Sequence, residues 1–198
     1  MIMNPKKVDR RVTDTREKLI LAGLEEINKY GINDFSARRV AKQCGISCSA
    51  PYKHFRDRDD FIEAIFLYLK NIYDERQKAL LEEYKDASCR EQLIRISMTY
   101  IDFLTEYPLF RRMIMQFYET VDEDLGILRG KLSDRSFDMV DKYCRQVDMP
   151  PDVRKRKQFI VRSIIFTAAM FFDNGELEYT EENRKLVESL ISREFDLP

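Results

Sequence analysis

The chain has 198 residues with 44% hydrophobic and 35% charged side chains and a formal net charge of -1, which is the composition of an ordinary globular protein. Its four cysteines form no CxxC pair and it has one histidine, so a zinc site of the usual kind is excluded and free thiols are expected. No apolar run approaches the roughly 20 residues of a membrane span, and the N-terminus lacks the apolar segment of a signal peptide. We therefore expect a cytoplasmic protein without membrane contact.

Helical periodicity fills nearly every stretch between the six glycines and six prolines, and no alternating strand pattern persists. The sequence therefore predicts an all-α fold with about nine helices. The first helix is expected to begin near Asp14, with Glu17 as its capping-box partner, and to end at Gly31.

Two short helices follow, and the corner between them has the pattern of a helix-turn-helix. Ser36 is expected to cap the first helix and Ser47 the second, which runs to about Phe55. Gly45 supplies the left-handed turn that such a tight corner needs, although any close pair of helices shares this pattern. Pro51 is tolerated in the second helix because the first four amide groups of a helix have no intrahelical partner.

Six longer helices complete the predicted fold. They are expected over about residues 57–84, 88–107, 108–119, 124–146, 152–173 and 180–195. The Ser88 and Glu91 pair is a capping box for the second of these helices, and Pro108 suits the first turn of the third. The helices over residues 152–173 and 180–195 are the basis of the homodimer that is inferred below.

Positive charge is concentrated at the N-terminal end of the chain. Residues 1–56 carry 12 lysines and arginines against 6 acidic residues, and the rest of the chain carries 22 against 29. A basic head on an acidic body favours a polyanionic partner, although a chance excess on a solvated surface would give the same count. The small residues from Cys48 to Ala50, beside Tyr52, Lys53 and His54, would let a backbone approach DNA closely, with phosphates near the helix N-terminus and the basic side chains.

The stretch from residue 13 to about residue 65 resembles the N-terminal signature of the TetR family of transcriptional regulators. The matching pieces are a helix that ends in "YG", followed by "FSARRVA", "CGIS", "YKHF" and "DDFI". The sequence departs from the family pattern at Ile46, where valine is usual, and at Pro51, where leucine or isoleucine is commoner. It also has Arg58-Asp59 where lysine and an acidic residue are frequent. Beyond residue 65 the resemblance rests on the number of helices alone.

The resemblance implies a helix-turn-helix DNA-binding domain over residues 1–58 and a helical ligand-binding and dimerisation domain over residues 59–198. Residues expected to approach base edges are Arg38, Cys48, Ser49, Ala50 and Tyr52. Residues expected at phosphates or at the helix tip against the groove are Ser36, Ser47, Tyr52, Lys53, His54 and Arg58. Because Cys48 and Ala50 form only weak hydrogen bonds or none, thymine-methyl contacts and DNA shape are expected to carry part of the specificity.

Some of these residues also have plainer interpretations. Tyr52 and Phe55 could pack in the core of the small N-terminal domain rather than face DNA. Cys48 could instead act as a redox switch on the DNA face. For Phe55 the core is the interpretation that we adopt.

The eighth helix is apolar nearly all round after Phe159, and the ninth offers a matching stripe of Leu186, Val187, Leu190 and Ile191. Such a helix must be covered on two sides, so we infer a homodimer through helices eight and nine; loops covering the helix in a monomer are the alternative. Candidate residues for a cavity that takes an apolar small molecule are Phe103, Phe110, Met113, Phe117, Tyr118, Phe137, Phe166 and Met170. Phenylalanine and methionine at helical spacing also suit a plain core.

These features predict a transcriptional regulator that responds to a ligand and binds a palindromic operator in double-stranded DNA. The resemblance to the family implies a repressor, which an apolar effector would release from the operator. The alternative is a helical protein-interaction module whose basic head binds an acidic protein. An enzyme built in a helical bundle would need a catalytic or metal set, and the chain has one histidine and no Glu-x-x-His pair. We therefore expect no catalytic residues, no metal and no cofactor.

Overall fold

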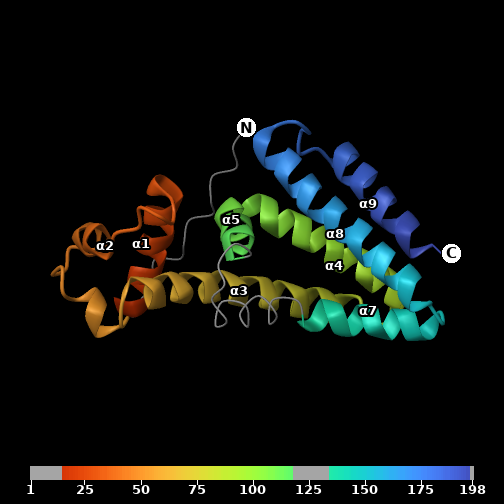
Figure 1. Ribbon diagram of the computed structural model, residues 1–198, viewed down its shortest axis with the longest axis horizontal. Helices are drawn as coiled ribbons and strands as arrows, with labels where there is room; N and C mark the ends of the chain where they lie inside the picture. Colours follow the sequence, from red (N-terminus) through yellow and green to blue (C-terminus); the bar gives the residue numbers. More distant parts are fainter. Residues whose placement is uncertain (1–14, 118–133, 197–198) are drawn as a thin grey trace. The chain divides into compact units, whose positions relative to one another are not determined.

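The computed structural model describes residues 15–117 and 134–196, which are the coloured ribbons of Figure 1. All regular structure within these two ranges is helical, with eight α-helices, one 3₁₀ helix and no strand. The elements in chain order are α1 (Thr15–Tyr30), α2 (Ala37–Gln43), the 3₁₀ helix η1 (Pro51–Lys53), α3 (Arg58–Glu83), α4 (Cys89–Glu106), α5 (Pro108–Phe117), α7 (Asp134–Gln146), α8 (Pro151–Asn174) and α9 (Glu181–Phe195). The all-α prediction is confirmed, and the helix count is close to the predicted nine.

The chain divides into two compact units, Met1–Ile72 and Tyr73–Pro198, and the division falls inside the long helix α3. The domain boundary expected from the sequence, at residues 58–59, coincides with the beginning of α3. Asp57 caps this helix, because its carboxylate accepts the amide hydrogens of Asp59 (3.0 Å) and Asp60 (2.9 Å). The assignment of separate functions to the two sides of residue 58 stays a prediction.

Aromatic side chains form the core of the first unit. Phe55 is 2% exposed and stacks on Phe61 of α3 with a centroid distance of 3.9 Å, while Phe35 meets Phe61 edge-on at 5.1 Å. The expectation that Phe55 belongs to the core is therefore confirmed. Gly23 brings α1 close to α3, because a Cβ atom there would lie 2.7 Å from Cδ1 of Ile65.

The predicted third α-helix, over residues 47–55, is wrong: the segment is a turn followed by the 3₁₀ helix η1. Its backbone hydrogen bonds span three residues from Ser47 to His54, as from the amide of Ala50 to the carbonyl of Ser47 (2.9 Å), and only the amide of Phe55 reaches back four residues, to Pro51 (2.9 Å). Pro51 has no N–H to donate to the carbonyl of Ser47 four residues earlier, so the first α-helical bond cannot form. Ser47 therefore caps no α-helix, and its hydroxyl lies 3.2 Å from that of Ser49.

In the second unit α4 packs against α7, α8 and α9, and α8 and α9 lie side by side (Figure 1). Helices α4, α5, α8 and α9 begin within one residue of the predicted positions, whereas the predicted start of the helix over residues 124–146 lies outside the described residues. The Ser88 hydroxyl accepts the amide hydrogen of Glu91 (3.1 Å), and the Thr180 hydroxyl accepts that of Asn183 (3.2 Å). Pro108 is the first residue of α5. None of the helices in the described ranges is long and apolar enough to cross a bilayer.

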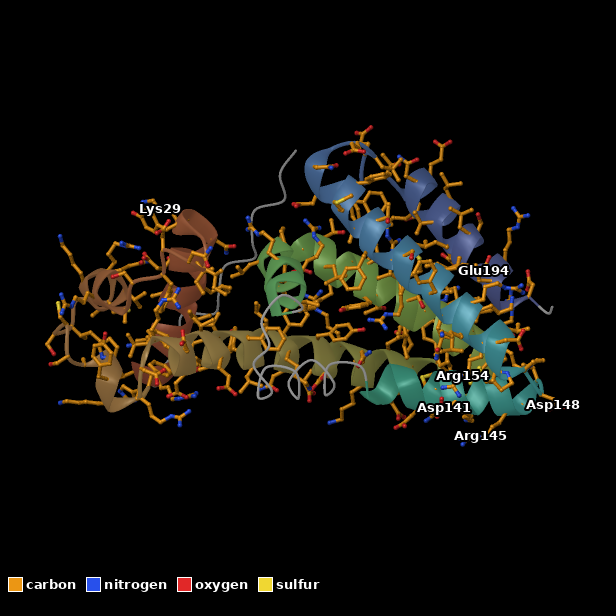
Figure 2. All side chains as sticks on the ribbon, in the orientation of Figure 1. Lys29, Asp141, Arg145, Asp148, Arg154 and Glu194 are labelled. Carbon is orange, nitrogen blue, oxygen red and sulfur yellow. The ribbon has the colours of Figure 1, made fainter. Side chains whose placement is uncertain are left out.

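Polar contacts tie the ends of α7, α8 and α9 together. Arg154 on α8 forms an ion pair with Asp141 on α7 (Figure 2). Lys157, one turn further along α8, donates to the carbonyl of Glu194 on α9 at 2.8 Å. The beginning of α8 is thereby fixed beside the end of α9, and the two helices run antiparallel.

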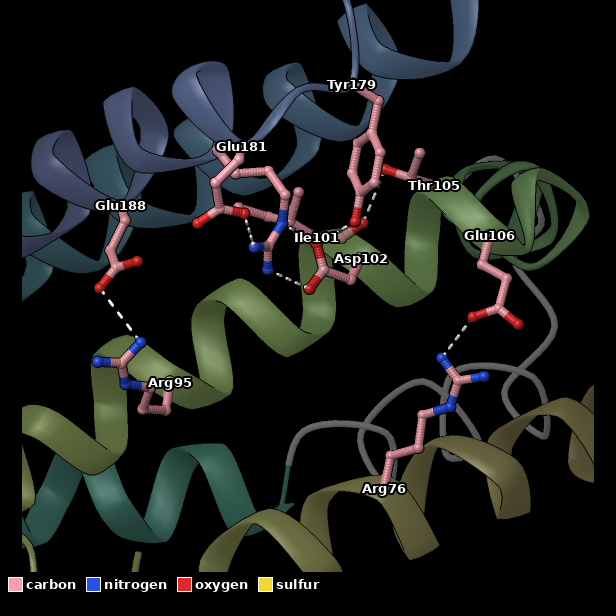
Figure 3. A network of polar contacts seen from close by, with 10 residues as sticks. Arg76, Arg95, Ile101, Asp102, Thr105, Glu106, Tyr179, Glu181 and Glu188 are labelled. Atoms are coloured by element: carbon pink, nitrogen blue, oxygen red, sulfur yellow. Dashed lines mark hydrogen bonds and ion pairs between the residues drawn. The ribbon is translucent and has the colours of Figure 1, made fainter. Parts of the chain in front are cut away.

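A second polar network joins α4 to α9 and to the loop before it (Figure 3). The carboxylate of Asp102 accepts hydrogen bonds from the Arg184 guanidinium (2.6 Å) and from the Tyr179 hydroxyl (2.8 Å). Further along the same helices, Arg95 pairs with Glu188 at 3.4 Å. Partial burial, followed by the hydrogen bond to Asp102, raises the pKa of the Tyr179 phenol, which is 43% exposed, from 10.0 to about 12.

The raised pKa predicts how the stability of the second unit depends on alkaline pH. The neutral phenol stabilises the fold fully below its unfolded-state pKa of about 10, and this stabilisation is lost as the pH rises towards 12. Urea unfolding of the wild type and of Tyr179→Phe should therefore show a stability difference that is constant below pH 10 and shrinks above it. Parallel pH profiles for the two proteins would contradict the assignment.

Candidate nucleic-acid interface

An open hollow of about 400 Å³ lies on the first unit, lined by Arg38, Cys48, Ser49 and Tyr52. Arg38 comes from the first turn of α2, and the other three come from the turn before η1 and from η1 itself. All four are residues for which the sequence predicts contact with base edges. The structure thus brings together, on one surface, side chains that are separated by up to 14 positions in the chain.

The corner between α2 and the following turn sets the position of this hollow. Gly45 has a φ of 69°, a conformation that glycine adopts without the steric cost a side chain would bring. The amide of Gly45 donates to the carbonyl of Lys42 (3.1 Å) and that of Ile46 to the carbonyl of Ala41 (3.0 Å), which closes the end of α2. The chain therefore reverses within a few residues and returns beside the start of α2.

Small and polar side chains cover the exposed part of the turn. Cys48 and Ser49 are exposed and Ala50 is half-buried, so little bulk separates the backbone from whatever meets this surface. Cys48 is a free thiol, as are the other three cysteines, which agrees with the expectation of free thiols. Tyr52 is 51% exposed, so the alternative that it packs in the core is wrong, and the sequence-predicted neighbours Lys53 and His54 are exposed as well.

Ser36 and Arg58 have intramolecular roles in the structure. The Ser36 hydroxyl accepts the amide hydrogen of Arg39 (3.4 Å) and caps α2, as predicted. The Arg58 guanidinium donates to the carbonyls of Ile32 and Asn33, in the loop between α1 and α2, and pairs with Asp59 at 3.0 Å. A phosphate contact by Arg58 stays a prediction, and it would compete with these bonds.

The most buried charge among the described residues of the first unit was not predicted from the sequence. The Glu26 side chain on α1 is 3% exposed and accepts a hydrogen bond from Nε of Arg39 on α2 at 2.5 Å. The same guanidinium donates to the carbonyl of Asp34 and lies 4.4 Å from the centre of the Tyr30 ring. Arg39 is therefore committed to holding α2 on α1, while its neighbour Arg38 faces the hollow. A possible signal was the position of Glu26 on the buried side of α1, next to Ile27 and seven residues after Leu19.

The residues predicted to line a ligand cavity are divided in the structure. Phe103 and Phe110 are fully buried and meet edge-on at 5.1 Å, whereas Phe166 is half-buried and Met170 is 45% exposed. Phe103 also packs against Tyr73 at 5.0 Å, so the two buried rings belong to a larger aromatic core. The side chains of Met113, Phe117 and Phe137, and the whole of Tyr118, lie outside the described part of the chain. Their predicted role stays a prediction.

Comparison with known proteins gives matches to one kind of regulator. Residues 19–65 match the family model of bacterial regulatory proteins of the tetR family. An HTH-type transcriptional regulator of Staphylococcus aureus (strain USA300) is 20% identical over 125 residues, which are 63% of this chain and 64% of that protein. The matched part thus spans about 64% of the length of this curated relative.

Two solved structures are similar over most of the chain. A TetR family transcription regulator from Marinobacter aquaeolei VT8 has a TM-score of 0.71 and 18% identity, and the match covers 90% of this chain and 94% of that one. The transcriptional regulator FadR from Bacillus subtilis, solved in complex with stearoyl-CoA, has a TM-score of 0.65 and 15% identity, with 91% and 97% covered. At these identities the likeness shows a shared fold.

The pair of Glu26 and Arg39 predicts that two adjacent arginines contribute very differently to stability. Arg39→Ala leaves the Glu26 carboxylate buried without its cation, which should lower the free energy of unfolding of the first unit by about 3 kcal/mol. Arg38→Ala, the matched control, removes an exposed side chain and should change it by less than about 0.5 kcal/mol. Urea unfolding followed by circular dichroism measures both.

A double variant separates the charge from the packing at this position. Glu26→Leu combined with Arg39→Leu removes both partners and should recover most of the stability that Arg39→Ala loses. Equal unfolding midpoints for Arg39→Ala and Arg38→Ala would show that the pair contributes nothing.

Proposed function

We propose that this chain, whose N-terminal domain belongs to the tetR family of bacterial regulatory proteins, is a transcriptional regulator that binds double-stranded DNA as a homodimer and responds to a small molecule. Residues 1–58 would bind the operator, and residues 59–198 would dimerise and bind the effector. Repression, with release from the operator when the effector binds, is the mode we propose. Such a protein would act in the cytoplasm.

The observation that carries the proposal is the hollow on the first unit. It combines an arginine, a tyrosine hydroxyl and small side chains on the outer side of a helix-turn-helix corner. Lys53 and His54 are exposed next to it, and Lys42 is exposed on α2. Cations beside a surface of small residues suit a duplex, because phosphates bind the cations and base edges can approach the backbone. An acidic protein would use the cations but would have no need of the small residues.

A homodimer is supported by an exposed apolar surface on α8 and α9. We call the four residues Phe159, Met170, Leu186 and Leu190 the outer face; their exposed fractions are 74%, 45%, 51% and 40%. Phe159 and Met170 are three helical turns apart, and Leu186 and Leu190 are one turn apart, so each pair lies on one side of its helix. Since α8 and α9 lie side by side (Figure 1), the two pairs can form a continuous surface. A second copy of the chain would cover it by a two-fold arrangement.

Two-fold symmetry has a direct consequence for the DNA sequence. Two copies of the first unit would meet successive major grooves about 34 Å apart, so the operator should be a near-palindrome. The operator and the dimer are therefore linked proposals, because one unit alone would make only half of the phosphate contacts.

An apolar effector is supported by the interior of the second unit and by one of the neighbours. The interior is rich in aromatic rings, among them Phe103, Phe110 and Tyr73, and the FadR neighbour was solved with stearoyl-CoA, which carries a long acyl chain. We propose an effector with a comparable apolar part. The effector would alter DNA binding only if its affinities differ between the form of the protein that binds the operator and the form that does not. The free energy of such coupling is typically 1–3 kcal/mol.

The dependence of DNA binding on salt tests the proposed function. Fluorescence anisotropy with labelled duplexes should show an association constant that falls steeply with salt, with a log–log slope of about -0.9 for each phosphate contacted. Because the proposed dimer carries two copies of Lys53, Lys53→Ala should make this slope shallower by about two units. Lys78→Ala, which removes an exposed cation of the second unit, should leave it unchanged. A wild-type protein that binds an acidic polypeptide but no duplex would support the protein-interaction alternative.

The outer face predicts the subunit composition. Leu186→Glu with Leu190→Glu places two charges in the proposed contact between copies, where desolvation disfavours them, so the variant should sediment as a monomer and lose most of its operator affinity. Lys142→Glu, on an exposed position of α7, is the control and should remain dimeric. A wild-type protein that sediments only as a monomer would contradict the homodimer.

A further inference from the structure

Arg38 differs from every other arginine in the described part of the first unit, because no described residue bonds to it. Arg39 is held by Glu26, and Arg58 is held by carbonyl groups of the loop between α1 and α2. Arg56 lies 3.7 Å from the Asp60 carboxylate. We propose that Arg38 recognises a guanine in each half of the DNA site, which makes it the main determinant of sequence specificity. This inference rests on the proposed function and goes beyond it.

The position of Arg38 follows from the pairing of its neighbour. Consecutive residues of an α-helix point about 100° apart, so the bond from Arg39 to the buried Glu26 fixes the rotation of α2 about its axis. That rotation turns Arg38 outwards into the hollow, beside Cys48, Ser49 and Tyr52. Because no described residue bonds to the Arg38 guanidinium, it breaks no bond within the described part of the chain when it meets a ligand.

The chemistry of the other three side chains in the hollow leaves base discrimination largely to Arg38. A thiol such as that of Cys48 forms weak hydrogen bonds, and the Ser49 hydroxyl lies 3.2 Å from the hydroxyl of Ser47. Tyr52 offers one hydroxyl. A guanidinium instead has five donors in a planar fork, which matches the two acceptors N7 and O6 that only guanine presents in the major groove.

A contact from Arg38 to a phosphate is the competing possibility, and it makes a different prediction. A phosphate contact carries no sequence information, so its loss weakens binding to all duplexes equally. A contact to guanine discriminates between bases, and its loss weakens binding to the preferred sequence far more than to others. A phosphate contact and a guanine contact are therefore distinguished by the ratio of the affinities for the preferred duplex and for another duplex. The affinity for one duplex alone does not distinguish them.

The experiment uses the full-length wild-type chain to select duplexes from a random-sequence library. Dissociation constants are then measured for the wild type, Arg38→Ala and Lys53→Ala on the selected duplex and on a scrambled duplex of equal composition. Arg38→Ala should reduce the preference for the selected duplex by roughly ten- to a hundredfold for each guanine contact, and thus by about a hundredfold or more for the two half-sites together. Lys53→Ala, the matched cation from the same surface, should weaken binding to both duplexes by the same factor.

Replacement of single guanines by 7-deazaguanine, which lacks N7, identifies the contacted base. At one guanine in each half-site the replacement should weaken binding of the wild type and leave Arg38→Ala unaffected. Arg38→Lys keeps the positive charge, so it should keep the salt dependence of the wild type while losing part of this discrimination. Thermal unfolding confirms that the variants are folded, as the exposure of Arg38 leads us to expect.

Two results would overturn the inference while leaving the proposed function intact. One is that Arg38→Ala weakens the selected and scrambled duplexes by the same factor. The other is that no guanine replacement distinguishes the wild type from Arg38→Ala. A wild-type protein that enriches no sequence from the library would instead contradict the proposed function itself.

Discussion

The carboxylate of Glu26 is almost completely removed from water, and a buried charge is costly unless a partner of opposite sign meets it. Arg39 supplies that partner from the neighbouring helix, at 2.5 Å. The pair fixes how α2 lies on α1, and it engages one of two adjacent arginines, although the Arg39 side chain stays 45% exposed. Arg38 is the arginine that no described residue holds, and the corner at Gly45 brings Cys48, Ser49 and Tyr52 to the same hollow. The proposed interface with DNA thus depends on an ion pair that does not itself face the hollow.

The sequence was sufficient where structure depends on neighbours along the chain. The caps at Ser36 and Ser88 formed as expected, because a hydroxyl before a helix needs only the amide three residues later. The third helix was mispredicted for a local reason as well. The free amides at a helix start explain why Pro51 is tolerated there, but its missing N–H removes the first α-helical bond, and the segment is a turn followed by a 3₁₀ helix.

The pairings that organise the two units could not be predicted in the same way. Glu26 and Arg39 are 13 residues apart and Arg58 lies 25 residues from Asn33, so their contacts exist only after the helices have packed. A charged residue on an otherwise apolar side of a helix indicates such a contact but does not name the partner. In the second unit the sequence positions of the aromatic residues fit a packed core and the lining of a cavity equally well, because both need apolar side chains at helical spacing. The burial of Phe103 and the exposure of Met170 depend on which neighbours cover each side of α4 and α8.

The central claim is that Arg39 of α2 holds the fold while the neighbouring Arg38 meets DNA. A structure of the dimer bound to its selected duplex tests this claim directly. We expect the Arg38 guanidinium within hydrogen-bonding distance of N7 and O6 of a guanine, with Arg39 still bonded to Glu26. A complex in which Arg39 leaves Glu26 for the DNA, or in which the hollow faces away from the duplex, would contradict the account.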